Sequence, residues 1–147
     1  MEYDNERNNT FFRFEDLRIY HKALGYTKWV NDATLPHMNG HSNGILERFN
    51  TSSHNIVLNI AEGSARNKSQ FIYYLKMAKS AVRECLVLTS IIHNMGIFDD
   101  SSEEESRNML MEMTKMLGAL ISSLQRNNHN RQDGDDEDDE FNHNDDM

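Results

Sequence analysis

Two long segments in the middle of the chain repeat their apolar and small residues every three or four positions, which is the spacing of one helix face. They meet at Gly63, which can adopt the left-handed backbone conformation that ends many helices. The pattern predicts a helical hairpin, centred on residues 48–84, onto which the rest of the chain packs. The repeating positions are Ile45, Phe49, Ser52, Ile56 and Ile60 before the glycine, and Phe71, Leu75, Ala78, Val82, Cys85 and Thr89 after it.

Two further helices are predicted on either side of this hairpin. The first covers about 15–34 and carries two apolar stripes, and Pro36 marks its exit because proline disfavours helical geometry at the preceding residue. The last covers about 99–126, where the apolar pattern fades. The stripes are Leu17, Tyr20, Leu24 and Thr27, and Ile19, Ala23, Tyr26 and Val30 in the first helix, and Met109, Met113, Met116, Leu120 and Leu124, flanked by Leu110, Leu117 and Ile121, in the last.

Residue types that favour helix ends stand at the boundaries of these segments. Hydroxyl, amide and carboxylate side chains at a helix start satisfy its unpaired N–H groups, and a glycine after the last turn ends it. The expected caps are Ser42 or Asn43 for the second helix, Asn67 with Gln70 for the third and Ser102 with Glu105 for the last, and Gly96 is expected to end the third.

Four helices with short connections predict an all-α, antiparallel up-down-up-down four-helix bundle. The bundle is expected to span residues 11–126, with a disordered segment at 1–10 and a disordered acidic tail at 127–147. The two stripes of the first helix imply burial on more than one side, and the helices together carry more apolar surface than one copy can cover. We therefore expect copies of the chain to associate.

The formal net charge of −9 is concentrated at the two ends of the chain. Residues 127–147 carry −8 and residues 1–10 carry −2, which leaves 11–126 at +1. Nucleic-acid binding must therefore rest on a local patch of the body. No segment reaches the roughly 20 apolar residues that cross a membrane, and the single Cys85 has no internal partner, so a cytoplasmic location without membrane contact is expected.

The run Asn59-Ile60-Ala61-Glu62-Gly63, followed by Arg66, resembles a family of bacterial four-helix-bundle proteins first found as reading frames inside intervening sequences of 23S ribosomal RNA genes. The likeness covers about 12–98. It departs at Asn50-Thr51, where the family often has two adjacent basic residues. Other matching positions are Phe14-Glu15-Asp16-Leu17, Ala23, Leu35-Pro36, Gly44-Ile45, Phe71, Leu75, Ala78-Lys79 and Glu84.

This resemblance implies a ring-like homopentamer of four-helix bundles. It also implies kinship with the accessory variability proteins of diversity-generating retroelements, which share the bundle, bind nucleic acid and act as partners of a reverse transcriptase. On this basis the expected partners are further copies of the chain, RNA and a reverse transcriptase.

Three basic residues of the third predicted helix, Lys76, Lys79 and Arg83, share one side of it at i, i+3 and i+7, and Arg66 and Lys68 stand near its start. Cationic side chains that neutralise phosphates supply most sequence-independent affinity for nucleic acid. These five residues form the candidate nucleic-acid-binding site. The alternative is an ordinary solvated helix face.

A second polar set, Arg48, Asn59, Glu62 and Glu84 around Gly63, is expected to join the second and third helices or to bridge copies, because buried polar groups need partners. Carboxylates can also act as acids or bases. Here no nucleophile, metal triad or phosphate-binding loop accompanies them, so a structural role is favoured and no enzyme activity is expected.

The histidines show no metal-ligand pattern. His37 and His41 stand four residues apart in an expected loop without a carboxylate or thiol beside them. His21, His54 and His93 are isolated on predicted helices. We therefore expect neither a metal nor a cofactor.

Two segments are open to more than one interpretation. The methionines of the last helix favour plain packing, with an adaptable partner-binding surface as the alternative. The acidic tail is by default a solvated segment. It could instead compete with RNA for the basic residues, or dock on a basic partner.

The leading hypothesis is a non-enzymatic oligomeric scaffold that binds RNA, a nucleic-acid enzyme or both. In its sharper form it is the accessory partner of a retroelement reverse transcriptase, in which several weak basic strips act together. The alternative is a structural protein–protein assembly module that binds no nucleic acid.

Overall fold

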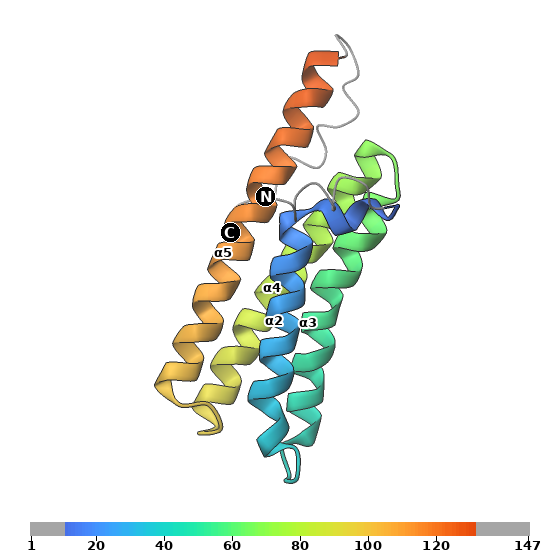
Figure 1. Cartoon of the computed structure of the whole chain (residues 1–147). Coiled ribbons are helices and arrows are strands. Elements are labelled where there is room, and N and C mark those ends of the chain that lie inside the picture. The colour runs from blue at the N-terminus through green and yellow to red at the C-terminus, as the bar shows by residue number, and fades with distance from the viewer. Residues whose placement is uncertain (1–10, 132–147) are drawn as a thin grey trace, which may run out of the picture.

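The computed structural model describes residues 11–131, with side chains described as far as Arg126. Within this range it contains four α-helices, two short 3-10 helices and no β-strand. The long helices run alternately up and down and lie side by side (Figure 1). The predicted all-α, antiparallel four-helix bundle is confirmed, while the expectations for 1–10 and 132–147 lie outside the described residues. The elements are η1 (Arg13–Asp16), α2 (Arg18–Thr34), η2 (Leu35–His37), α3 (Asn43–Ser64), α4 (Lys68–Asn94) and α5 (Asp100–Arg131).

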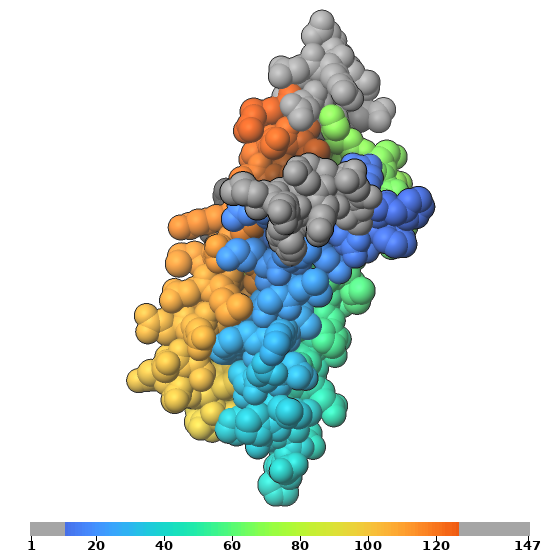
Figure 2. All heavy atoms as spheres, in the orientation of Figure 1, coloured from blue at the N-terminus to red at the C-terminus, as the bar shows by residue number. Residues whose placement is uncertain are grey.

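α2 and α4 occupy opposite corners of the bundle. Each of them packs against both α3 and α5, and the contact between α3 and α4 is the most extensive. Figure 2 shows the face formed by α2, with α3 on one side of it and α5 on the other. α4 therefore contributes to the opposite face. Across residues 11–131, every helix is too short or too polar to span a bilayer.

Three helix boundaries differ from the prediction. Residues 13–16 form η1 and Leu17 is extended (φ −90°, ψ 126°), so the first long helix begins only at Arg18. Ser42 precedes α3, but its side chain makes no capping hydrogen bond. α5 runs to Arg131, beyond the expected end, because helical backbone hydrogen bonding continues where neither proline nor glycine interrupts it.

The glycines at the two later helix junctions have different roles. Gly96 has φ +80° and ends α4, as predicted, and the N–H of Ile97 bonds the Ile92 carbonyl at 3.2 Å. Gly63 was expected to end α3 in the same way, and this prediction is wrong. Gly63 is helical, α3 continues to Ser64, and Gly96 alone has a positive φ among the described residues.

Side chains cap the starts of α4 and α5. Asn67 Oδ1 accepts a hydrogen bond from the Gln70 N–H at 2.9 Å, as the capping-box spacing predicted. At α5 the cap is Asp99, whose Oδ1 accepts from the Ser102 N–H at 2.8 Å. The predicted cap at Ser102 is therefore wrong, and the carboxylate of Asp99 is favoured there by the positive end of the helix dipole.

Most of the predicted apolar stripes form the core, with two corrections. Those of α3 and α4 are buried, apart from half-buried Ile45. In α2 only the stripe that contains Tyr26 is buried, and Leu24 of the other stripe is 41% exposed. In α5 most of the fully buried residues stand one position after the predicted ones in the sequence. The buried apolar residues are Leu110, Met113, Leu117 and Ile121, with Met109, Met116, Leu120 and Leu124 partly buried.

One cluster of hydroxyl groups lies in this apolar core. Ser106 Oγ is 2.8 Å from Tyr26 Oη and 2.8 Å from Thr89 Oγ1, and all three residues have 0% exposure. The Thr89 hydroxyl donates its proton to the Cys85 carbonyl, so Thr89 accepts from Ser106 and Ser106 accepts from Tyr26. The chain of bonds ties α2, α4 and α5 together and satisfies polar groups that would be costly to bury alone.

Candidate nucleic-acid interface

The basic strip of α4, defined here as Lys76, Lys79 and Arg83, lies along the side of this helix that faces α5. Arg83 is exposed, whereas Lys79 is only 9% exposed and the Lys76 ammonium is buried. The structure thus brings the three residues together on one side of the helix, but presents a single fully exposed cation there. Long basic side chains can bury their stems and still move their charged ends outward.

A groove between α4 and α5 begins at the end of this strip. Arg83 and Arg107 stand on its two walls, and its volume is about 360 Å³. The remaining lining is mostly apolar, and the exposed Met111 belongs to it. Two guanidinium groups at an apolar groove could contact both a phosphate and a base. The remaining lining residues are Val82, Leu86, Asn108, Leu110 and Thr114.

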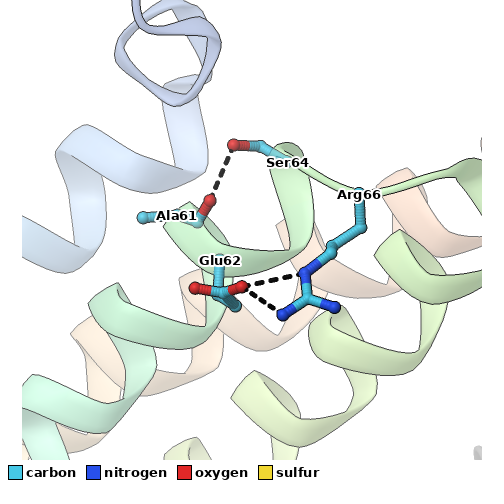
Figure 3. A network of polar contacts seen from close by, with 4 residues as sticks. All are labelled: Ala61, Glu62, Ser64 and Arg66. Atoms are coloured by element: carbon cyan, nitrogen blue, oxygen red, sulfur yellow. Dashed lines mark hydrogen bonds and ion pairs between the residues drawn. The ribbon is translucent and has the colours of Figure 1, made fainter.

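Arg66 and Lys68, the other two predicted contacts, lie away from this groove, Arg66 in the turn before α4 and Lys68 at the first residue of α4. Arg66 donates from Nε and Nη2 to Glu62 Oε2 at 2.8 and 2.6 Å (Figure 3). Its guanidinium also lies 5.3 Å from the centre of the Tyr74 ring. Lys68 is half-buried in the first turn of α4. These contacts give Arg66 a structural role at the α3–α4 turn.

The same turn shows why Gly63 stands where it does. A Cβ at Gly63 would lie 2.7 Å from Tyr74 Cβ and 3.0 Å from Phe71 Cδ1, far inside normal contact distance. Ser64, next to it, donates its hydroxyl to the Ala61 carbonyl at 2.9 Å (Figure 3). Glycine is needed here for the close approach of α3 to α4.

The second predicted polar set is partly a bridge between helices. Arg48 Nη2 donates to Glu84 Oε2 at 2.8 Å and joins α3 to α4, which confirms the expected contact. The hydrogen bond from Arg48, with a further one from Ser52, lowers the pKa of Glu84 despite its partial burial. Asn59 instead bonds the Asn55 carbonyl in its own helix. Glu62 bonds Arg66 rather than reaching across to another helix.

The outer face of α4 carries an apolar stripe that sequence reasoning missed. Its members are Tyr73, Met77, Val87 and Ile91, which are 45%, 41%, 54% and 39% exposed. A second groove, of about 540 Å³, runs beside the stripe between α3 and α4. Tyr73 and Met77 stand four residues apart, as do Val87 and Ile91, and these helical spacings were visible in the sequence. The exposed stripe does not stand out in the sequence, because α4 is apolar on most sides and its buried residues follow the same helical spacing.

His93 is also not isolated, contrary to the prediction. Its Nε2 lies 2.8 Å from Asp100 Oδ1 and 3.7 Å from Glu103 Oε1, across the turn between α4 and α5. The hydrogen bond to Asp100 raises the pKa of His93, and the charges of Glu103 and Asp99 act in the same direction. The ligand atoms of these three residues lie within 4.8 Å of one another. When the imidazole is protonated, the cluster is an ion pair of one cation with two carboxylates.

Cys85 is a buried thiol of low reactivity. Its side chain is fully buried, and burial raises the pKa of its thiol to about 12. The reactive thiolate is therefore scarce at neutral pH. Cys85 serves packing beside the hydroxyl cluster.

The comparisons with known proteins agree with this geometry. A comparison with curated protein sequences gives no match. The sequence profile of the 23S rRNA-intervening sequence protein family matches residues 15–119, which span all four helices of the bundle. The match covers most of the chain and includes both helices that meet at Gly63. This chain belongs to the 23S rRNA-intervening sequence protein family.

Proposed function

We propose that this protein is a non-enzymatic scaffold whose copies associate through the outer face of α4 and together bind RNA. The observation that carries the proposal is the exposed apolar stripe of Tyr73, Met77, Val87 and Ile91. They lie on one face of α4 as two pairs, with Ser80 and Glu84 between the pairs, and exposed apolar groups rimmed by polar residues mark interaction sites. A second copy covers such a site, and the resemblance to the family suggests a homopentamer.

The RNA-binding part of the proposal rests on position and on the family. The family takes its description from intervening sequences of 23S rRNA. The basic strip borders the apolar stripe on α4, so association through the stripe would bring strips of several copies near one another. Contacts that are weak in one copy then add through multivalency.

An assembly module without nucleic-acid binding is the competing proposal. The burial of Lys79 and the body charge of +1 over residues 11–126 both favour it. In this case the stripe and the grooves beside it would serve copies of the chain and other proteins alone.

We also propose a nucleic-acid enzyme, such as the reverse transcriptase of a retroelement, as the protein partner. The support is the resemblance of the family to retroelement accessory proteins. Pull-down of a reverse transcriptase by the oligomer, with loss of binding by a variant that cannot assemble, would test this partner directly.

The mass in solution tests the assembly. We expect sedimentation and native mass spectrometry to give about five chains of 17.1 kDa. Met77→Glu with Val87→Glu should give a folded single chain, because two carboxylates in a covered patch must be desolvated. Leu58→Glu is the matched control, since Leu58 is 62% exposed on α3 and outside the stripe. A folded wild-type monomer at micromolar concentration would refute the assembly.

Binding to a structured RNA, followed by fluorescence anisotropy against salt, separates the two functions. Arg83→Glu should weaken binding by about tenfold at low salt and flatten the salt dependence. Lys28→Glu should change little, because Lys28 lies on α2 and pairs with Asp32 at 2.7 Å. Equal effects of the two variants, or no binding at low salt in any form of the protein, would favour the pure assembly module.

A further inference from the structure

The groove of about 360 Å³ between α4 and α5 lies at the end of the basic strip. Arg83 and Arg107 line the groove at one level, and Lys79 and Lys76 follow along α4 toward its start. On α5, a Cβ at Gly118 would meet nothing within 4 Å, so the helix leaves open space there. The side of α4 that faces α5 thus carries one exposed cation, Arg83, followed by Lys79 and Lys76, whose long side chains must turn outward to meet a bound chain.

The chain itself supplies a segment of complementary charge. Residues 132–147 contain nine acidic residues and no lysine or arginine, and residues 135–140 are six consecutive acids. A run of carboxylates presents closely spaced negative charges, as a nucleic-acid backbone does. The basic strip therefore has two suitable occupants, an RNA and this acidic segment.

The position of the end of α5 puts the segment within reach of the strip. α5 ends at Arg131, and Thr114, which lines the groove with Arg83, lies 17 residues earlier. At about 1.5 Å per helical residue this separation is about 26 Å. An extended chain covers about 3.3 Å per residue, so eight residues beyond Arg131 return to the level of Thr114. α4 is antiparallel to α5, so Lys79 and Lys76 lie between that level and the end of α5.

We propose that residues 132–147 fold back along α5 and dock on the basic strip of the same chain, with the acids 135–140 against Lys76, Lys79 and Arg83. The docked segment withholds the strip from RNA, so binding requires its displacement. This second step rests on the proposed function, whereas the docking does not. The docking is intramolecular because a tether of this length gives an effective concentration of the order of millimolar.

Carbodiimide cross-linking tests the docking without any RNA. The reagent joins a carboxylate to a neighbouring lysine, so peptides from 133–140 should be found linked to Lys76 or Lys79. Lys28 is the control, because it is exposed at the opposite corner of the bundle on α2. The links should disappear at about 1 M salt, where exposed charges are screened within about 3 Å.

Three outcomes of this experiment would overturn the docking. Links spread evenly over all lysines would mean that the segment has no preferred site. Links that persist at high salt would mean that charge attraction does not hold it there. In a mixture of isotopically heavy and light chains, links should join peptides of the same isotope. Links between heavy and light peptides would assign the segment to a second copy, which contradicts the intramolecular proposal.

The withholding of the strip is tested with the full-length chain and a neutral tail. The variant changes every acid in 135–140 to its amide, for example Asp135→Asn and Glu137→Gln, and keeps the length. Its affinity for a structured RNA at low salt should rise about tenfold over wild type. Adding Arg83→Glu to the neutral tail should abolish the gain. An unchanged affinity for RNA, or a gain that survives Arg83→Glu, would show that the segment does not withhold the strip from RNA. If no form of the protein binds RNA, the proposed function is refuted, and the cross-linking experiment alone decides whether the segment docks.

Discussion

The two turns that flank α4 contain the same kinds of residue but depend on different physical effects. Both contain a glycine, both begin the next helix with an Asn or Asp cap, and both are closed by an ion pair. At the α3–α4 turn, Gly63 is helical and has no room for a side chain. At the α4–α5 turn, Gly96 has open space around it and a φ of +80°. The first turn is specified by packing, and the second by backbone conformation.

The ion pairs differ in the same sense. The contact of Arg66 with Glu62 rests on a guanidinium, which stays charged in proteins, and the hydrogen bond to Glu62 raises the pKa of Arg66 further. The contact of His93 with Asp100 depends on the protonation of an imidazole, which changes near neutral pH. The α3–α4 turn is therefore a fixed junction. The α4–α5 turn is a junction whose strength follows the pH.

The largest test of this contrast is Gly63→Ala. The new methyl group would meet Tyr74 Cβ and Phe71 Cδ1, and crowding of this kind costs about 3 kcal/mol, which the higher helix propensity of alanine offsets by about 1 kcal/mol. We expect urea denaturation to show a net loss of about 2 kcal/mol in the free energy of unfolding.

Gly118→Ala is the matched control for that substitution. Gly118 lies within α5 with nothing within 4 Å of a built Cβ, so alanine should stabilise the protein by about 0.5–1 kcal/mol. Opposite signs for the two substitutions would establish that space decides the effect at Gly63. If Gly63→Ala proved as stable as Gly118→Ala, the steric account of the α3–α4 turn would be wrong.

A smaller loss is expected for Gly96→Ala. Here alanine meets no neighbour, but it must hold the left-handed conformation, which costs an L-residue about 1 kcal/mol. Gly96→Asn should recover part of the loss, because asparagine tolerates this conformation better than alanine. Recovery at Gly96, with no recovery for Gly63→Asn, is the pattern that thermal unfolding should show. A Gly96→Ala protein with wild-type stability would leave the conformational account without support.

These two glycines also show how far a sequence can be read. The three-to-four-residue periodicity gave the four helices and most of their buried faces, because burial of one face is what selects such a pattern. The same pattern could not tell a glycine that needs a positive φ from one that needs close contact. Gly63 and Gly96 look alike in sequence, and only the position of Tyr74 across the turn separates them.

The candidate site was less predictable than the helices, because the spacing of charged residues does not report their burial. Helix spacing placed Lys76, Lys79 and Arg83 on one side of α4, but it does not say how much of that side a neighbouring helix covers. The 9% exposure of Lys79 is the clearest case. The partner of His93 was missed because Asp100 lies seven residues away beyond a turn, outside any helical spacing.

The smallest expected effect, and the sharpest test of the contrast between the ion pairs, is a pH dependence from His93. Its pKa is raised in the folded protein, first by the hydrogen bond to Asp100 and then by the charges of Glu103 and Asp99. A raised pKa means that the folded state binds the proton more tightly than the unfolded state does. The stability from this contact is therefore complete below the unfolded value near 6.5, and it is lost as the pH rises through the folded value. Denaturation midpoints should fall over this window in the wild type and stay level in His93→Gln. Arg66→Gln, which breaks the ion pair at the other turn, should lower stability equally at both ends of this pH window. If the pH dependence of stability survives in His93→Gln, the titrating group lies elsewhere and the two turns do not differ in this respect.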